Sequence, residues 1–162
     1  MSQSDRMNRP LFGTAERFKA EKKYGDVWLY SWDLVNKMLE AILVQGLGYG
    51  EDRVDDMSFY NKIKTLKAAK CLTDEQERIL LHFGQKRVPI SHYYTDTMMT
   101  AADDGPKDEL ADIAINALKA AEKAFETHVP PVRVFEGIKT YTLSFRAVEP
   151  NAYIEKEPRR DR

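Results

Sequence analysis

The chain has 162 residues, of which 43% are hydrophobic and 31% charged, and its formal net charge is −1. This length and composition fit one globular domain with its own core, and the near-neutral charge excludes a basic surface spread over the whole domain for nucleic acid. A single cysteine excludes an internal disulfide, and no apolar run approaches the ~20 residues that a membrane-spanning helix needs. Because the N-terminus also lacks the apolar region of a signal peptide, we expect a cytoplasmic protein without a membrane partner.

The first strong element in chain order is a helix over residues 26–45. Residues 1–25 are expected to form a polar leader and a short helix that Thr14 caps and Gly25 ends. Asp26 is placed to cap the longer helix, whose apolar residues recur at helical spacing. They include Trp28, Trp32, Val35, Leu39 and Ile42. The tryptophans, one turn apart, indicate core positions or, alternatively, a dimer interface, where aromatic anchors are enriched.

Two further helices follow a glycine-rich break and an acidic segment, residues 51–56, that reads as a loop. The next helix begins at Thr73, because Thr73 and Gln76 form a capping-box pattern, and it is expected to direct Ile79, Leu80 and Phe83 inward. His82 lies close to this apolar face and is expected to be a structural histidine. The preceding helix covers residues 58–70. Its lysines are expected on a solvated face or, alternatively, on a basic face toward phosphates: Lys62, Lys64 and Lys67.

A proline interrupts the pattern after these helices. Pro89 cannot sit in a helix interior without a kink, and proline is favoured at the first position of a new helix. We therefore expect a break near residues 86–88 and a fourth helix over residues 89–102. A last helix over residues 106–128, capped by Asp104, carries mostly small residues that allow close helix approach. Its stripe contains Leu110, Ile113, Ala117, Ala121 and Ala124.

Apolar residues alternate with polar ones in the second half of residues 132–148, which predicts one or two strands turning near Glu136 and Gly137. An isolated hairpin is marginal in water, so this one should pack on the helices or pair with another chain. The tail, residues 150–162, is expected to be disordered. The sequence thus predicts a mainly α fold: an up-and-down bundle of four to five helices over residues 26–129, with a small C-terminal β-hairpin over residues 130–149.

Arg87 and His92 are the strongest candidates for chemistry, one on each side of the expected helix start. Arginine can hold a phosphate through two parallel hydrogen bonds, and histidine can move a proton near neutral pH. Together they suit attack by a ribose 2′-hydroxyl on the adjacent phosphate, which needs no metal. This spacing also arises by chance. The alternative is a solvated Arg87 and a His92 that is packed by Tyr93.

Residues of a short, degenerate motif precede this pair and lie between its two members. Those before Arg87 are Ser58, Phe59, Lys62, Ile63, Leu66 and Leu72, and those between Arg87 and His92 are Ile90 and Ser91. Their order over residues 26–128 resembles HEPN-type domains, especially the mannitol-operon-repressor-like branch, in which an arginine and a histidine end an "RNxxAH"-like signature. The resemblance implies an all-α homodimer in which Arg87 and His92 of both protomers line a cleft for metal-independent RNA cleavage. The candidate RNA contacts beside them are Lys86, Ser91 and Tyr93.

The sequence departs from this signature at one point. Val88 stands where the family usually has a polar residue, and Pro89 follows it. This departure favours an alternative function, a non-catalytic dimeric interaction or regulatory module of the same fold with a protein partner.

No metal or cofactor is expected. Cys71, His82, His92 and His128 lack the paired close spacing of zinc motifs, and residues 51–56 lack the ligand spacing of a calcium loop. The glycines at positions 46, 48 and 50 follow a helix, whereas a dinucleotide motif follows a strand. Cys71 has no base beside it and is expected to be a buried or interfacial thiol.

Overall fold

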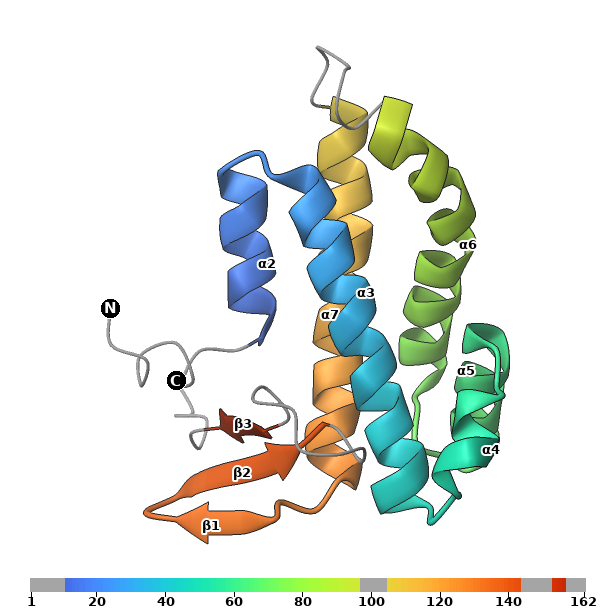
Figure 1. Cartoon of the computed structure of the whole chain (residues 1–162), viewed down its shortest axis with the longest axis vertical. Coiled ribbons are helices and arrows are strands. Elements are labelled where there is room, and N and C mark those ends of the chain that lie inside the picture. Colours follow the sequence, from blue (N-terminus) through green and yellow to red (C-terminus); the bar gives the residue numbers. More distant parts are fainter. Residues whose placement is uncertain (1–10, 97–104, 144–152, 157–162) are drawn as a thin grey trace.

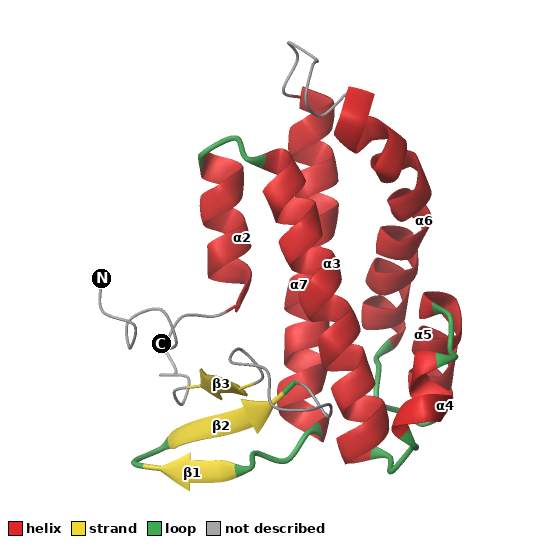
Figure 2. Ribbon diagram, viewed as in Figure 1, coloured by secondary structure: helices red, strands yellow, loops and turns green. Residues whose placement is uncertain are grey.

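The computed structural model describes residues 11–96, 105–143 and 153–156, and the fold is given for these residues. They form six α-helices, one π-helical turn and a three-stranded antiparallel sheet (Figures 1 and 2). In chain order the elements are α2 (Leu11–Ala20), α3 (Tyr24–Ala41), the π-helical turn η1 (Ile42–Gly46), α4 (Glu51–Asp55), α5 (Phe59–Ala68), α6 (Asp74–Asp96), α7 (Gly105–His128), β1 (Arg133–Phe135), β2 (Ile138–Thr142) and β3 (Tyr153–Lys156). The predicted mainly α bundle with a small C-terminal hairpin is confirmed.

Several predicted features lie outside the described residues. They are most of the leader, the end of the helix expected over residues 89–102, the Asp104 cap, and residues 144–148 of the expected strands. Among the described helices, none is long and apolar enough to cross a lipid bilayer.

α3 and α7 are the two central helices and pack side by side (Figure 1). The buried side of α7 consists largely of alanine, and small side chains allow two helix axes to approach closely. Its alanines with at most 2% exposure are Ala111, Ala114, Ala117, Ala121 and Ala124. Trp28 of α3 links the two helices, because its indole Nε1 donates a hydrogen bond to the carbonyl oxygen of Leu110 at 3.0 Å. The small-residue stripe that the sequence predicts is therefore part of the core.

An aromatic cluster joins α3 to α5 and α6. Trp28 stacks on Phe83 with ring centroids 4.7 Å apart, and Trp32 packs against Phe59 at 4.8 Å and Phe83 at 5.4 Å. Gly84 permits this packing, because a Cβ at that position would lie 2.8 Å from the Phe59 ring. Trp28 is buried and Trp32 half-buried, so both tryptophans contribute to the core.

α6 is one continuous helix through Pro89. The expected break near residues 86–88 and the new helix start at Pro89 are therefore wrong. An interior proline removes one backbone hydrogen bond and bends a helix, and the turns on either side can hold it together; Figure 1 shows that α6 is curved. The predicted start is confirmed. Thr73 Oγ1 accepts from the Gln76 N–H at 3.1 Å, and Gln76 Oε1 accepts from the Thr73 N–H at 2.9 Å.

Three element boundaries near the N-terminal half differ from the sequence expectation. α2 begins at Leu11, before the Thr14 that was expected to cap it, and α3 begins at Tyr24, so Asp26 lies within its first turn. Residues 51–56 contain the short helix α4 in place of the expected loop. Its acidic first residues suit the positive end of a helix, and Val54 anchors it by being buried.

The predicted hairpin forms between β1 and β2. Its two turn residues, Glu136 and Gly137, have φ angles of 49° and 78°, and positive φ at both positions is the signature of a type I′ turn. Tyr141 of β2 is buried against Phe125 of α7, with ring centroids 4.9 Å apart, and this contact seats the sheet on the bundle. The expectation of a disordered tail is wrong for residues 153–156, which form the third strand, β3.

A buried carboxylate connects three elements. Glu122 of α7 is 1% exposed and forms an ion pair with Lys156 of β3. Lys156 also pairs with Glu126 at 3.2 Å. The backbone N–H of Leu11, at the start of α2, donates a hydrogen bond to Glu122 Oε1 at 3.0 Å. Both the first and the last described elements are thus attached to the same carboxylate.

Candidate functional site

α6 carries both residues that the sequence analysis singles out for chemistry. Arg87 and His92 lie in its second half, where the structure describes the backbone alone, as it does for Ser91 and Tyr93. Five residues of α-helix correspond to a rotation of about 140° beyond one full turn and a rise of about 7.5 Å. By backbone geometry positions 87 and 92 therefore lie about 140° apart around the helix axis, and the helix start that was expected to bring them to one pocket is absent.

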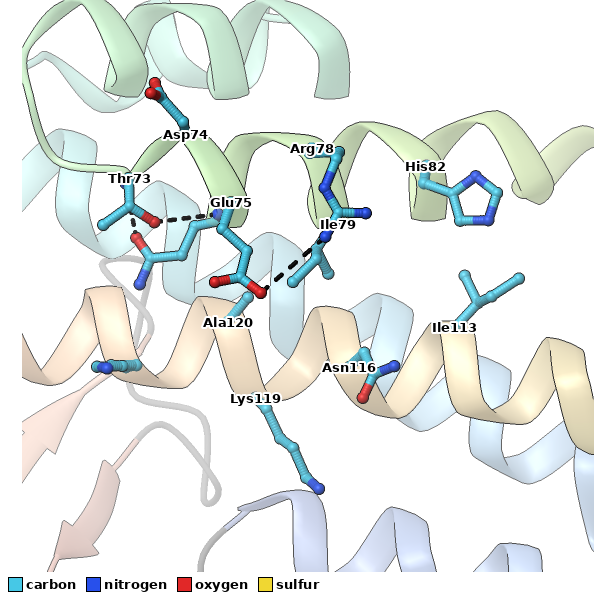
Figure 3. Close-up of a pocket in the computed structure, with 12 residues that line it drawn as sticks. Thr73, Asp74, Glu75, Arg78, Ile79, His82, Ile113, Asn116, Lys119 and Ala120 are labelled. Atoms are coloured by element: carbon cyan, nitrogen blue, oxygen red, sulfur yellow. Dashed lines mark hydrogen bonds and ion pairs between the residues drawn. The ribbon is translucent and has the colours of Figure 1, made fainter.

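A groove lies beside the first half of the same helix (Figure 3). We call it the α6–α7 groove, and its volume is about 820 Å³. It is lined from the α6 side by Thr73, Asp74, Glu75, Gln76, Arg78, Ile79 and His82, and from α7 by Ile113, Asn116, Lys119, Ala120 and Lys123. Lys86 follows His82 by about one turn on α6 and lies beyond the residues that line the groove.

Small and branched side chains make the floor of the α6–α7 groove. Ile79 and Ile113 are half-buried, and Ala120, with only a methyl group, leaves space between the two helices. Figure 3 shows His82 and Ile113 facing each other across one end. This apolar floor with polar rims can accept a ligand that has both flat or apolar parts and charged groups.

The rims carry charges of both signs, and ion pairs neutralise most of them. Asp74 pairs with Lys67 at 2.9 Å, and this hydrogen bond holds the pKa of the Asp74 carboxyl below its usual range. Glu75 lies 4.0 Å from Arg78. Figure 3 shows Lys119 pointing away from α6, and it pairs with Glu16 of α2 at 3.1 Å.

Lys123 differs from these residues. It is exposed and forms no ion pair within the described part of the chain. Its ammonium group is therefore the rim cation that is most available to an anionic ligand. Together with Arg78, His82 and the amide of Asn116, it offers hydrogen-bond donors on both sides of the groove.

Two residues, His82 beside the groove and Lys62 of α5, are placed differently from the sequence prediction. His82 is exposed and lines the groove, whereas a structural role on the apolar face was expected. Ile79, three residues before His82 on α6, is half-buried and lies at the border of the buried stripe. His82 lies beyond this border, on the exposed side of the helix. Lys62 was expected on a solvated face, yet it is buried and pairs with Glu40 at 2.7 Å.

The groove residues of α7 were not proposed from the sequence. Asn116, Lys119 and Lys123 recur at intervals of three and four residues, which places them on one side of a helix. This polar stripe, opposite the alanine stripe, was the signal that could have found them. The sequence could not show that α6 would provide the opposite wall.

A second hollow, of about 600 Å³, lies between α2 and α7. Its polar groups pair with one another: Lys19 with Asp112 at 2.6 Å, and the Tyr24 hydroxyl with Asp108 at 2.8 Å. The hydrogen bond to Asp112 raises the pKa of Lys19. With its donors and acceptors already engaged, this hollow offers less to a ligand than the α6–α7 groove.

The described residues show no arrangement for metal or thiol chemistry. No group of three histidine, cysteine, aspartate or glutamate side chains in this part of the chain could hold a metal ion. Cys71 is buried, as expected, and burial raises the pKa of its thiol. A raised pKa disfavours the thiolate, which is the nucleophilic form.

Comparison with protein-family models, with curated proteins and with solved structures found no match to this chain. The function is therefore argued from its own residues.

Proposed function

We propose that this chain is an RNA-acting domain of the HEPN type, in which Arg87 holds phosphate and His92 transfers protons without a metal. The mainly α bundle supports the proposal, because it is the architecture that the sequence resemblance implies. The observation that carries it is the course of α6. This helix contributes Arg78 and His82 to the α6–α7 groove and then continues through Lys86 to positions 87 and 92. An RNA strand lying along α6 would pass both regions.

The proposed reaction is an internal phosphoryl transfer. The ribose 2′-oxygen attacks the adjacent phosphorus, and the bond from phosphorus to the 5′-oxygen breaks. His92 accepts the proton of the 2′-hydroxyl as a base, and the protonated imidazole then gives a proton to the departing 5′-oxygen, so the histidine returns to its starting form. The products are a 2′,3′-cyclic phosphate and a 5′-hydroxyl. Arg87 would stabilise the charge that develops on the phosphate oxygens.

The continuous α6 sets a condition on this reaction. Because positions 87 and 92 lie about 140° apart around the helix axis, joint action on one phosphate calls for Arg87 of one protomer and the partner's His92. The proposal therefore includes a homodimer for catalysis. Lys86, Ser91 and Tyr93 would contact the RNA on either side of the reacting phosphate.

A specific observation favours a second function, a non-catalytic interaction or regulatory module. A helix start at Pro89 would have offered free backbone N–H groups to a phosphate beside Arg87. α6 passes through Pro89 without such a start, and Val88 supplies no polar side chain there. In this alternative the same surface binds RNA or a protein partner and performs no chemistry.

An RNA cleavage and binding assay tests both functions. Single-stranded RNA oligonucleotides of varied sequence are incubated with the purified protein in EDTA, and binding is followed in parallel by fluorescence anisotropy. His92→Ala is expected to lower the cleavage rate by about 10²–10⁴-fold and to leave RNA affinity nearly unchanged, because loss of a general acid–base group has this effect. Arg87→Ala is expected to weaken both.

Two matched variants serve as controls. His128→Ala changes a histidine at the far end of α7, and Arg53→Ala changes an arginine of α4; neither lines the α6–α7 groove. Both should behave as wild type. Binding without cleavage would support the non-catalytic module. Cleavage that persists in His92→Ala would overturn the catalytic role, and the absence of both binding and cleavage would overturn an RNA function.

A further inference from the structure

β1 is an outer strand of the sheet, and its apolar residues are exposed. Val134 and Phe135 are 60% and 58% exposed, and Val132, just before the strand, is 56% exposed. Within the described residues β1 pairs with β2 alone, and Figure 1 shows its other side as the outer edge of the sheet. An exposed edge strand with apolar side chains is a template for pairing with another strand.

The register of the hairpin identifies the backbone groups that point outward. Phe135 pairs with Ile138 across the two-residue turn, and such a pair exchanges hydrogen bonds inside the hairpin. Because hydrogen-bonded and non-hydrogen-bonded pairs alternate, the N–H and C=O of Val134 point away from β2. The backbone N–H of Val132 donates a hydrogen bond to the carbonyl oxygen of Thr140 at 2.8 Å, so this donor is not available to a strand at the outer edge. Within the described part of the chain, Val134 thus presents both a donor and an acceptor at the outer edge of β1.

The side chains of β1 are complementary to the same strand run in the opposite direction. If Val134 is paired with a second Val134 in an antiparallel ladder, Arg133 of each strand stands directly opposite Phe135 of the other. Arg133 and Phe135 already favour each other within the chain, since the guanidinium lies 5.4 Å from the ring centroid. In the paired arrangement each guanidinium would be flanked by two rings, an attraction between cation and ring.

We propose that β1 pairs with β1 of a second copy of this chain around a two-fold axis at Val134. The two sheets would join into one six-stranded antiparallel sheet, with two backbone hydrogen bonds between the Val134 residues. Figure 1 places the edge of β1 away from the helices, which leaves room for a second bundle on the far side. The contact is small, so association should depend strongly on protein concentration.

This interface is separate from the proposed RNA function. β1 and the second half of α6 lie at opposite ends of the molecule (Figure 1), so a β1 dimer does not bring Arg87 near the partner's His92. Loss of β1 pairing in a β1 variant therefore leaves the proposed catalytic contact unchanged, whereas a monomer at every concentration would contradict both the β1 pairing and the catalytic dimer.

Sedimentation velocity over low to high micromolar concentrations tests the pairing. Wild type should associate as concentration rises. Val134→Lys places a charge on the edge while keeping the hairpin register, and it should raise the dimer Kd by roughly tenfold or more. The matched control is Leu29→Lys, because Leu29 is an equally exposed apolar residue, 59% exposed, on α3. This control should associate like wild type.

Disulfide trapping tests the position of the axis. In a Cys71→Ala background, Val134→Cys should form a disulfide-linked dimer under copper–phenanthroline oxidation, because a directly opposed pair has Cα atoms about 5.5 Å apart. Lys139→Cys on β2 should not, since three strand spacings of about 4.8 Å would separate the two copies. A monomer at every concentration would overturn the proposal. So would a dimer that Val134→Lys leaves intact and Val134→Cys does not trap.

Discussion

The inner and outer sides of the α6–α7 pair are built from neighbouring residues with opposite roles. On the inner side, Phe83 and the alanines of α7 are buried in the core; on the outer side, His82 and Lys123 border an open groove. His82 and Phe83 are adjacent in sequence, yet a helical rotation of about 100° per residue separates core from surface. The comparison implies that stability and ligand affinity can be changed independently in these two helices.

The largest effect is expected on the inner side. Phe83→Ala removes the ring that stacks on Trp28 and contacts Trp32 and Phe59. The free energy of unfolding should fall by about 3–5 kcal/mol, the usual range for a buried phenylalanine. Urea denaturation followed by tryptophan fluorescence measures this change. His82→Ala, next to it on the outer side, should change the free energy of unfolding by less than about 0.5 kcal/mol. Equal losses of stability in the two variants would contradict the assignment of inner and outer sides.

Gly84→Ala tests how tightly α6 packs on α5. Alanine is the better helix former by about 1 kcal/mol, but its Cβ would lie 2.8 Å from the Phe59 ring. We expect a net destabilisation of about 1 kcal/mol, since overpacking typically costs about 1–3 kcal/mol. In a Phe59→Ala background the same change should become stabilising. A stabilising Gly84→Ala in the wild-type background would show that the ring moves aside freely.

Lys123→Ala addresses the outer side. Its stability should stay within about 0.5 kcal/mol of wild type, because the side chain is exposed and forms no ion pair within the described residues. Its RNA affinity should fall, and the slope of log affinity against log salt should decrease by about one, as for the loss of one phosphate contact. Fluorescence anisotropy at several salt concentrations measures both. An unchanged salt slope would remove Lys123 from the RNA-binding surface.

The smallest effect concerns the rim of the groove at the start of α6. The hydrogen bond from Lys67 lowers the pKa of Asp74. A lowered folded-state pKa means that Asp74 stabilises the fold above the ordinary aspartate range, about pH 4, and that this contribution is lost as the pH falls through the folded-state value. Asp74→Asn should therefore have a slightly lower Tm than wild type at neutral pH, and the two Tm values should converge in acid. A constant difference across pH would assign the effect to something other than this carboxyl.

Local sequence signals predicted much of the fold. The capping box at Thr73 and Gln76, the turn at Glu136 and Gly137, and the alanine stripe of α7 each depend on residues close together in the chain. The break at Pro89 was predicted wrongly because helix continuity there depends on the turns around the proline. Lys62 was misassigned for a similar reason: its burial depends on Glu40, which lies on another helix.

The candidate site was less predictable than the fold. A groove needs two walls, and no local pattern shows that the polar stripe of α7 faces Arg78 and His82. Arg87 and His92 lie on a helix whose first half borders the groove, and their spacing indicated a shared pocket through a helix start that does not exist. Both the groove and the surroundings of positions 87 and 92 depend on how helices that are far apart in sequence pack together. Short-range periodicity does not predict this packing.

The buried Glu122 has a consequence for any shortened or extended form of this protein. Within the described residues its Oε2 atom has no hydrogen-bond partner, and its Oε1 atom depends on Leu11 and Lys156, which come from near opposite termini. Removing residues 153–156 would leave an anion inside the core without its counter-charge, a strongly unfavourable state. A truncation that removes either residue would therefore disturb the buried carboxylate in the C-terminal half of α7, and expression boundaries should keep both Leu11 and Lys156.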